Sequence, residues 1–595
     1  MPGHIKGATQ KPKNMKKTMR QFLGALKKWR VALIVVCVVS IISTALTTVG
    51  PMILGQMTTS ATTSLANGEG VKWDELGTLA VILIILYIVS GVIGYLASVI
   101  LVRITAKFSK EMREQIMAKI SRLPVSYFDK VQIGDVMSRM TNDVETVAGQ
   151  FGNTVTTIII SVTTLVGMLA MMLYISVSLS IIAIVVVPLG LIVVGKITRK
   201  AQKYFRAQRT LLGTLNSTIE EDYTGQSIIR ANSHEAKSIS AFKQTNSQLY
   251  NASWKSQFYG SLAFPVTHVF TNIGYIAICV LGGHFALIGA ITIGNLQAFI
   301  QYVNRFNRPI TEVAQMAATI QQIMAAAERI FEFLNEEEEP VEKNVRNIDI
   351  EAVKGEVEFH DMAFSYDKKK PVISNFSCKI TPGMNVAIVG PTGAGKTTVV
   401  NLLMRFYDPD SGYITIDGVP TSELARKDVR RMFGMVLQDT WLFSGTVYDN
   451  LKYGAEDATE ADVKRAVKAV GIEHFIESLP KGYKTEISED SDNISAGEKQ
   501  LLTIARAMVA DQPMMILDEA TSNVDTRTEQ LIQNAFDKLT EGRTSFVIAH
   551  RLSTIRNSDL ILVMKDGNII EQGKHEDLLA LNGFYAELYN SQFAQ

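Results

Sequence analysis

Cysteine is scarce in this sequence: the three that occur among 595 residues, Cys37, Cys279 and Cys378, lie far apart. No CxxC pair and no Cys/His spacing typical of a metal site surrounds any of them. A disulfide framework and a thiolate metal centre are both disfavoured, because each needs clustered ligands. We expect the three residues to be small buried hydrophobic side chains.

Charge is sparse in six long stretches of the first half of the chain, and each stretch is long enough to cross a membrane. About 20 apolar residues in a helix span roughly 30 Å of hydrocarbon. The stretches are Val31–Leu54, Leu76–Val102, Thr154–Ile175, Leu179–Lys196, Phe258–Ile288 and Gly294–Met316. The last is the most polar, and the third and fourth are nearly continuous, so we place a turn at Tyr174–Ser178.

Acidic residues are absent from the interior of the first five stretches, where His268 and His284 are the only charged or imidazole side chains away from the ends. Carboxylates at mid-membrane usually mark ion or proton routes, so their absence argues against a proton-coupled carrier. His268 either touches a substrate or makes helix-to-helix hydrogen bonds. The sixth stretch carries Arg305, Arg308 and Glu312, which predicts a face that lines a water-filled cavity or leaves the membrane early.

Lys and Arg are unevenly distributed around these stretches. Met1–Arg30 contains nine of them and no acidic residue, so the amino terminus is predicted to be cytoplasmic. The long segments between the second and third stretches and between the fourth and fifth are also basic, which places both in the cytoplasm. At about 1.5 Å per residue, helices in these segments extend several tens of Å beyond the membrane.

Composition changes near residue 330, where apolar runs give way to mixed charge and regular turns. The predicted domains are a basic segment over residues 1–30, a six-helix membrane domain over 31–330, a linker over 331–350 and a soluble domain over 351–595. The linker includes Asn335–Pro340, a charge run that cannot bury itself and ends in a proline that discourages helix continuation.

The soluble domain contains a full phosphate-binding loop, Gly390-Pro-Thr-Gly-Ala-Gly-Lys-Thr397, between the apolar strand Asn385–Val389 and the helical run Thr398–Arg405. Its glycines let backbone N–H groups close around phosphates at a helix amino terminus. Lys396 is predicted to reach the β and γ phosphates, and the Thr397 hydroxyl to help hold Mg²⁺. The predicted ATP contacts are Gly390, Pro391, Thr392, Gly393, Ala394, Gly395, Lys396, Thr397 and Thr398.

A second phosphate motif follows downstream, where the apolar strand Met514–Asp518 ends in a carboxylate that precedes Glu519. A carboxylate at a strand end can orient Mg²⁺, and a neighbouring glutamate can position or polarise the attacking water. Asp518 is therefore a predicted ATP and Mg²⁺ contact, and Glu519 a predicted catalytic residue.

With these motifs the chain resembles a half-transporter of the ABC exporter superfamily, in its multidrug and lipid exporter group of type IV fold, over nearly its whole length. Tyr366 resembles the aromatic that stacks on adenine, Gln438 the catalytic glutamine that senses Mg²⁺, and His550 the switch histidine at the γ phosphate. Ser522–Asp525 is similar to the loop that crosses the dimer interface. The resemblance implies six spans with long cytoplasmic helical extensions, fused to an α/β nucleotide-binding domain.

The resemblance also implies how the domains communicate and where they work. Segments near Pro124–Lys130 and Arg206–Leu215 are expected to be coupling helices seated on the ATP domains. ATP and Mg²⁺ are the implied cofactors. The implied location is a bacterial plasma membrane, with the amino terminus and the ATP domain in the cytoplasm.

One motif departs from the family pattern Leu-Ser-Gly-Gly-Gln, which here is Ile494-Ser-Ala-Gly-Glu498. In the family this segment caps the ATP of the other subunit, so Ser495 and Gly497 are expected nucleotide contacts. Ala496 adds a methyl group, and Glu498 adds negative charge near an anionic nucleotide. Both changes predict a weak cap, which favours a heterodimer with a second half-transporter chain; a homodimer with two equal sites is the alternative.

The function predicted from these features is ATP-driven export by alternating access. A soluble ABC factor acting on nucleic acid is excluded by the six spans, and intact Glu519 favours a pump over a channel. Importers usually carry membrane and ATP domains on separate chains. The sparsely charged membrane half predicts contact with lipid and a hydrophobic or amphipathic cargo, with multidrug export first and lipid or peptide export as the alternatives.

Overall fold

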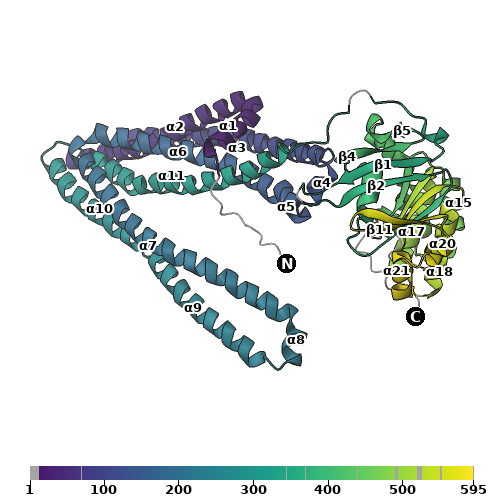
Figure 1. Ribbon diagram of the computed structural model, residues 1–595. Helices are drawn as coiled ribbons and strands as arrows, with labels where there is room; N and C mark the ends of the chain where they lie inside the picture. Colours follow the sequence, from purple (N-terminus) through teal and green to yellow (C-terminus); the bar gives the residue numbers. More distant parts are fainter. Residues whose placement is uncertain are drawn as a thin grey trace. The chain divides into compact units, whose positions relative to one another are not determined.

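The computed structural model describes residues 13–68, 70–342, 345–368, 370–438, 440–488, 494–518, 526–549 and 552–593. The chain divides into two compact units, each with its own contacts (Figure 1). The helical unit comprises Met1–Arg122 and Ile133–Glu337, and the sheet unit comprises Leu123–Gln132 and Glu338–Gln595. The short segment Leu123–Gln132 therefore belongs with the second unit, although its neighbours in sequence belong to the first.

Long helices build the helical unit. They are α1 (Met15–Ala25), α2 (Arg30–Ala66), α3 (Trp73–Ile120), α6 (Val144–Ile175), α7 (Val177–Thr224), α9 (Glu235–Ser261), α10 (Ala263–Leu287) and α11 (Ile293–Leu334). Among the described residues, five helical runs are long and apolar enough to cross a membrane: Met15–Ala66, Trp73–Ile120, Ile133–Ile175, Val177–Thr224 and Glu235–Leu287. α11 contains the sixth predicted span and is less apolar than these five runs, because it includes charged residues.

The outer surface of these helices is suited to lipid. On α3, Val81, Ile84, Ile85 and Ile88 are all more than half exposed. A water-facing helix would expose charged residues instead, so this unpaired apolar face indicates contact with hydrocarbon. The predicted turn between the third and fourth spans is confirmed, because α6 ends and α7 begins at Ser176.

The second predicted coupling segment, Arg206–Leu215, is wrong, because it lies inside the continuous helix α7. The chain reverses later, at Gly225, and passes through α8 (Gln226–Ala231) at the tip of a hairpin in which α7 and α9 run side by side (Figure 1). The polar half of α7 contains no proline that would end the helix. Its composition alone does not predict a helix there, and packing against α9 stabilises it.

A buried ion pair joins the start of α6 to α11. Asp143 closes the π-helical turn Arg139–Asp143 that precedes α6, and its carboxylate accepts two bonds from Arg329. The distances are 2.8 Å from Nε to Oδ2 and 2.5 Å from Nη2 to Oδ1. The Asp143 side chain is only 7% exposed and that of Arg329 is 34% exposed. The bidentate geometry fixes the two helices relative to each other.

We expect Arg329→Leu to lower the free energy of unfolding by about 2–3 kcal/mol, because it leaves the Asp143 carboxylate buried without its partner. Thermal unfolding of the full chain in detergent measures this. Lys28→Leu is the matched control, since the Lys28–Glu111 pair is 68% and 33% exposed. Its loss should cost less than about 1 kcal/mol. Equal shifts in the two variants would show that the Asp143 pair stabilises no more than a surface pair does.

The sheet unit is built around a ten-stranded mixed sheet with the order β5-β4-β1-β2-β12-β11-β3-β10-β9-β6. The strands are β1 (Val357–Phe364), β2 (Ile373–Ile380), β3 (Asn385–Val389), β4 (Ser411–Ile416), β5 (Val419–Pro420), β6 (Phe433–Val436), β9 (Met514–Asp518), β10 (Thr544–Ile548), β11 (Leu560–Lys565) and β12 (Asn568–Gly573). Helices α12 (Lys396–Leu403) and α17 (Ala496–Ala510) pack against it. The α/β fold predicted for this part of the chain is confirmed.

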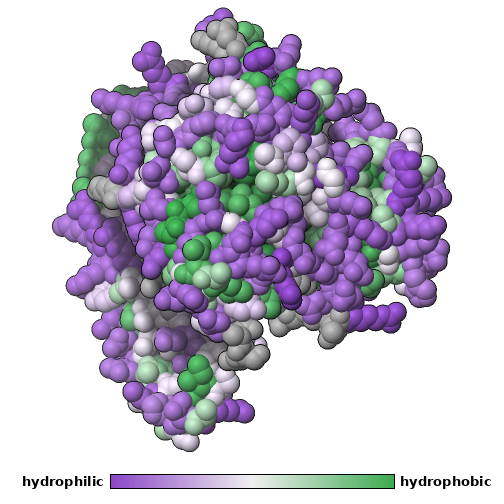
Figure 2. All heavy atoms as spheres, turned by 45° about the vertical axis from the view of Figure 1, so that its right-hand side comes forward, coloured by the Kyte–Doolittle hydropathy of each residue, from purple (hydrophilic) through white to green (hydrophobic). Residues whose placement is uncertain are grey.

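Alternate residues of β3 enter two different hydrophobic cores. Val386 and Ile388 pack with residues of α12, whereas Ala387 and Val389 pack with residues of α17. A strand covered on both faces is apolar along nearly its whole length, as β3 is from Val386 to Val389. The described surface of this unit that comes forward in Figure 2 is mostly hydrophilic, unlike the exposed face of α3.

Candidate functional site

Four parallel strands direct the predicted motifs to one edge of the sheet. β10 pairs with β3 and with β9, and β9 pairs with β6, all in parallel. Ile548 at the end of β10 lies opposite Ile388 on one side and Asp518 on the other. The phosphate-binding loop follows β3, Asp518 ends β9, and Gln438 follows β6. Ligands of such sheets bind beyond the carboxyl ends of the strands, which is where these segments meet.

Two catalytic predictions, Glu519 and His550, lie outside the described residues, as does the predicted interface loop Ser522–Asp525. The strands that lead to the first two, β9 and β10, are described and are hydrogen-bonded neighbours. Glu519 directly follows Asp518, and His550 is the second residue after β10. Gln438 is exposed at the same edge, two residues after β6.

The loop conformation requires glycine at two positions. A Cβ atom on Gly390 would lie 2.3 Å from the carbonyl oxygen of Met564, which is backbone and cannot move aside. Gly395, the residue before α12, has φ +100°, a left-handed conformation that other residues rarely adopt. The chain can therefore turn from β3 into α12 with its N–H groups directed toward a ligand at the helix start.

Lys396 occupies the space inside this loop. Its Nζ donates hydrogen bonds to the carbonyl oxygens of Gly390, at 2.6 Å, and Pro391, at 3.1 Å. Burial lowers the pKa of the Lys396 ammonium from its ordinary value, while the nearby negative charge of Asp518 opposes that shift. A phosphate would replace the two carbonyl oxygens as a stronger, charged acceptor.

The remaining loop residues differ in what they offer a ligand. Thr392 and Thr397 are exposed, so the Thr397 hydroxyl is accessible. The Thr398 side chain is 5% exposed and packs inward, which leaves its backbone rather than its hydroxyl for a nucleotide. Among the described residues no group of three His, Cys, Asp or Glu side chains could hold a metal. Oxygen ligands from Thr397 and Asp518 fit Mg²⁺, which is usually held by one or two protein oxygens together with phosphates.

Tyr366 is held in place by three neighbours. Its ring packs edge to face against Tyr407, with centroids 5.0 Å apart at 89°, and against Phe364 at 4.9 Å. Its hydroxyl accepts a hydrogen bond from Asn401 Nδ2 at 3.1 Å, and Asn401 belongs to α12, the helix that starts at the loop. The ring remains 42% exposed, so a face is available for stacking.

The altered signature forms the start of α17. The Ser495 side chain accepts a hydrogen bond from the Glu498 backbone N–H at 3.3 Å, and Glu498 Oε2 accepts from the Ser495 N–H at 2.8 Å and from its hydroxyl at 2.7 Å. This reciprocal capping box satisfies the helix start. Gly497 is buried, whereas Ala496 is exposed. The expectation that Glu498 simply adds charge is incomplete, because its carboxylate folds back onto Ser495.

Comparison with known proteins gives the family. The model of the ABC transporter transmembrane region matches residues 33–310, and the model of the ABC transporter domain matches residues 373–522. This chain belongs to the ABC transporter family. It therefore binds ATP and couples ATP hydrolysis to transport, as a multi-pass plasma-membrane protein with a cytoplasmic ATP domain.

Relatives of this ABC transporter extend over most of its length. It is 43% identical over 521 residues to the fatty acid ABC transporter ATP-binding/permease protein of Mycobacterium bovis, covering 88% of this chain and 82% of the relative. It is 35% identical over 529 residues to an ATP-dependent lipid A-core flippase of Syntrophus aciditrophicus, covering 89% and 87%. A solved structure of a bacterial Atm1-family ABC exporter with ATP bound is similar at a TM-score of 0.71 and 27% identity, covering 95% and 99%. The transporter is thus an exporter.

Sequence reasoning missed Arg506, which ties the signature helix of this ABC exporter to the segment that follows Gln438. Arg506 lies on α17 and donates to the carbonyl oxygens of Asn450, at 2.8 Å, and Trp441, at 3.0 Å. Its guanidinium also lies over the Phe443 ring. The sequence signal for Arg506 is that it is the one charged residue in the mostly apolar run Leu501–Ala510.

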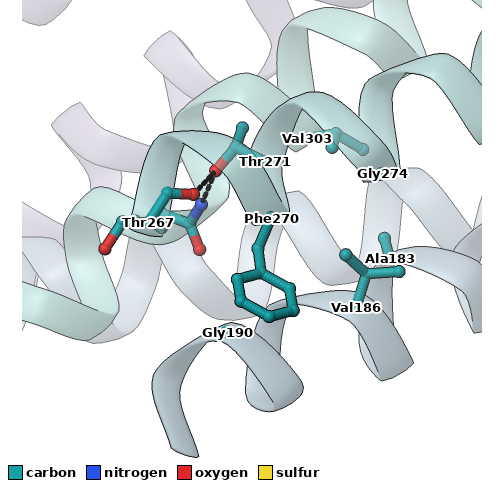
Figure 3. A pocket seen from close by; sticks show the side chains of 9 residues that line it. Ala183, Val186, Gly190, Thr267, Phe270, Thr271, Gly274 and Val303 are labelled. Carbon is teal, nitrogen blue, oxygen red and sulfur yellow. Dashed lines mark hydrogen bonds between the residues drawn. The ribbon is translucent and has the colours of Figure 1, made fainter. Parts of the chain in front are cut away.

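Two cavities in the described part of the exporter's helical unit differ greatly in size. One, of about 20 Å³, lies between α7, α10 and α11 and is lined by Phe270 and Gly190 beside the hydrogen bond from Asn307 to Thr271 (Figure 3). It has room for about one water molecule. The other, of about 430 Å³, lies between α2 and α6. Its lining is mostly apolar and consists of Ile41, Ala45, Thr48, Val49, Val162, Thr163, Val166, Gly167, Ala170 and Met171.

Proposed function

We propose that this ABC exporter moves hydrophobic or amphipathic compounds across the plasma membrane by alternating access, as one half of a dimer. The main support is that the Gly390–Thr397 loop and Asp518 meet at one edge of the sheet, in a chain whose described residues include five helical runs long and apolar enough to cross a membrane. Closure of two ATP domains around nucleotide then turns an inward-facing cavity outward.

Each residue of the loop has a proposed task. Lys396 binds the β and γ phosphates, and Tyr366 stacks on adenine. Thr397, Gln438 and Asp518 hold Mg²⁺ together with the phosphates. Bound Mg²⁺ neutralises charge on the transferring phosphoryl group. Lys396 and Tyr366 are already held in place by hydrogen bonds within the chain. The chain therefore positions both side chains before ATP binds.

Hydrolysis is proposed to rest on Glu519, which positions the attacking water, and on His550, which contacts the γ phosphate. Both follow strands that end at the loop edge. Ser495 and Gly497 are proposed to cap the ATP held by the partner chain.

A heterodimer is proposed over a homodimer. Glu498 draws the Ser495 hydroxyl into a hydrogen bond, so that hydroxyl must leave a carboxylate before it can donate to a partner's phosphate. This supports a weak cap over the partner's site and an intact site in this chain. Purification of the tagged chain from its native membrane tests the proposal. A second chain of similar size in equal amount supports it, and a self-paired complex with brisk ATPase activity contradicts it.

We expect Glu498→Gln to strengthen nucleotide binding at the site it caps by roughly fivefold. Glutamine preserves the capping box and removes one negative charge. Two unit charges a few ångström apart in water-like surroundings interact by about 1 kcal/mol, which corresponds to about fivefold in affinity. Titration of the purified complex with a fluorescent ATP analogue measures the change. Glu473→Gln, in the first turn of α16 (Glu473–Ser478), is the matched control. Unchanged affinity in Glu498→Gln would mean that the carboxylate does not weaken the cap.

The cargo is proposed to be of the multidrug type, with a lipid or fatty acid as the second candidate because two relatives are named for such substrates. Proteoliposomes containing the purified complex separate the two. ATP-dependent movement of a cationic hydrophobic dye favours a multidrug exporter, whereas movement of a fluorescent fatty acid alone favours a lipid exporter. Failure to move either compound in an ATPase-active preparation would contradict the proposed cargo class.

A further inference from the structure

The segment Leu123–Gln132 belongs to the sheet unit, where it lies against a tyrosine. It contains α4 (Val125–Phe128), followed by Asp129, whose carboxylate accepts a hydrogen bond from the Tyr407 hydroxyl. Burial, with a further contribution from Asp129, raises the pKa of Tyr407, so this hydroxyl remains protonated and able to donate. The two residues are 278 positions apart in sequence.

Tyr407 in turn supports Tyr366. The two rings meet edge to face at 5.0 Å, and Tyr407 also packs against Phe364 at 5.3 Å. Together with the hydrogen bond from Asn401, this contact fixes the plane of the Tyr366 ring. A base can stack well only on a ring whose orientation is settled, because aromatic contacts depend on geometry.

The first residues of the sheet unit after α11 also lie near Tyr407 in structure. Glu342, which lies beyond α11, contacts Arg405 at 3.1 Å and accepts from the Arg426 backbone N–H at 3.0 Å. Glu339, from the acidic run expected to stay in solvent, accepts from Arg430 at 2.7 Å. Arg405 is 8% exposed and stands two residues before Tyr407. The residues from Arg405 to Asp408, here named the RFYD turn, thus contact Glu342 through Arg405 and Asp129 through Tyr407.

We propose that Tyr407 is a positioning residue for the adenine base, and that Asp129 makes this positioning depend on the seating of α4. The proposal rests on the proposed role of Tyr366. When α4 is seated, Asp129 holds the Tyr407 hydroxyl, and the Tyr407 ring holds Tyr366 in its stacking orientation. When α4 withdraws, the hydroxyl loses its acceptor and the Tyr366 ring loses its lateral support. Movement of the membrane helices then changes the affinity for ATP by altering the contact of Tyr366 with the adenine base, while the phosphate contacts stay the same.

The test compares ATP with inorganic triphosphate, which reaches the phosphate loop but has no base. Tyr407→Phe keeps the ring and its packing and removes only the hydroxyl. In the purified full-length complex we expect it to raise the KM and the Kd for ATP about threefold, with kcat and triphosphate affinity unchanged. Asp129→Asn should have the same effect. Because the two residues act through one bond, the double variant should be no worse than either single variant.

Controls separate this proposal from the proposed function. Tyr413→Phe and Asp410→Asn change an exposed tyrosine and an exposed aspartate of the same unit, and both should leave the KM for ATP unchanged. Tyr366→Ala should weaken ATP binding about tenfold and leave triphosphate binding intact. If Tyr366→Ala weakens ATP binding and Tyr407→Phe does not, Tyr407 is not a positioning residue. The role of Tyr407 is then wrong, whereas the proposed role of Tyr366 stands. If Tyr366→Ala has no effect, the assigned base contact is wrong and both fail. Equal losses for ATP and triphosphate would also overturn it.

Discussion

Lys396→Ala is expected to lower ATP hydrolysis by at least about 100-fold and to weaken ATP binding itself. The ammonium is held at the centre of the loop by the carbonyl oxygens of Gly390 and Pro391. It is half desolvated there, and burial has already lowered its pKa. Phosphate oxygens restore the charge compensation that burial removed, so a large part of the binding energy is expected to come from this one group.

Phosphate release and titration with a fluorescent ATP analogue measure the two effects of Lys396→Ala separately. Lys574→Ala is the matched control, because Lys574 also stands at a helix start, before α20 (His575–Ala580), but away from the loop. It should leave both measurements unchanged. A Lys396→Ala complex that keeps more than about a tenth of its ATPase activity would contradict the proposed role.

The fold of the sheet unit could be predicted because its strands are short apolar runs that end in recognisable chemistry. The phosphate loop, Asp518 and Gln438 each follow a strand, and parallel strands bring their carboxyl ends together. Sequence order and strand type are therefore enough to gather these residues. The same reasoning places the chain entering Glu519 and His550, although these two residues themselves stay predictions.

Contacts between distant polar residues could not be predicted in the same way. The bond from Tyr407 to Asp129 and the bidentate pair of Arg329 with Asp143 join residues with no shared periodicity. Each side chain alone is typical of a solvated surface. Their pairing depends on which helices pack together, which is decided by the apolar faces of those helices and leaves no local signal.

The structure contradicts one expectation from the sequence and completes another. The polar half of α7 lacks a residue that ends a helix, and only its packing against α9 shows that Arg206–Leu215 continues rather than turns. Glu498 was judged by its charge alone, although a Ser with a Glu three residues later is also a pattern for a capping box. Helix packing decided the first case, and the reciprocal capping box at the start of α17 decided the second.

Glu519→Gln is expected to lower ATP hydrolysis by about 100-fold to 1,000-fold while leaving ATP binding intact. Glutamine keeps the size of the side chain and removes its ability to accept a proton from the attacking water. The adjacent Asp518 and the loop are unchanged, so the proposed phosphate contact of Lys396 should remain. Bound ATP should accumulate in the variant, whereas Lys396→Ala should bind little.

Comparing ATP binding and hydrolysis in Glu519→Gln and Lys396→Ala distinguishes a residue of the chemical step from a residue that binds ATP. Glu541→Gln, just beyond α18 (Thr526–Thr540), is the control and should hydrolyse ATP normally. The proposed heterodimer has a weakly hydrolysing partner site, so Glu519→Gln in this chain should remove most of the turnover of the whole complex. Loss of only half of the turnover would indicate two equal sites and hence a homodimer-like mechanism. Normal hydrolysis would mean that another residue activates the water, and the geometry of the β9 end would have to be explained by Mg²⁺ binding through Asp518 alone.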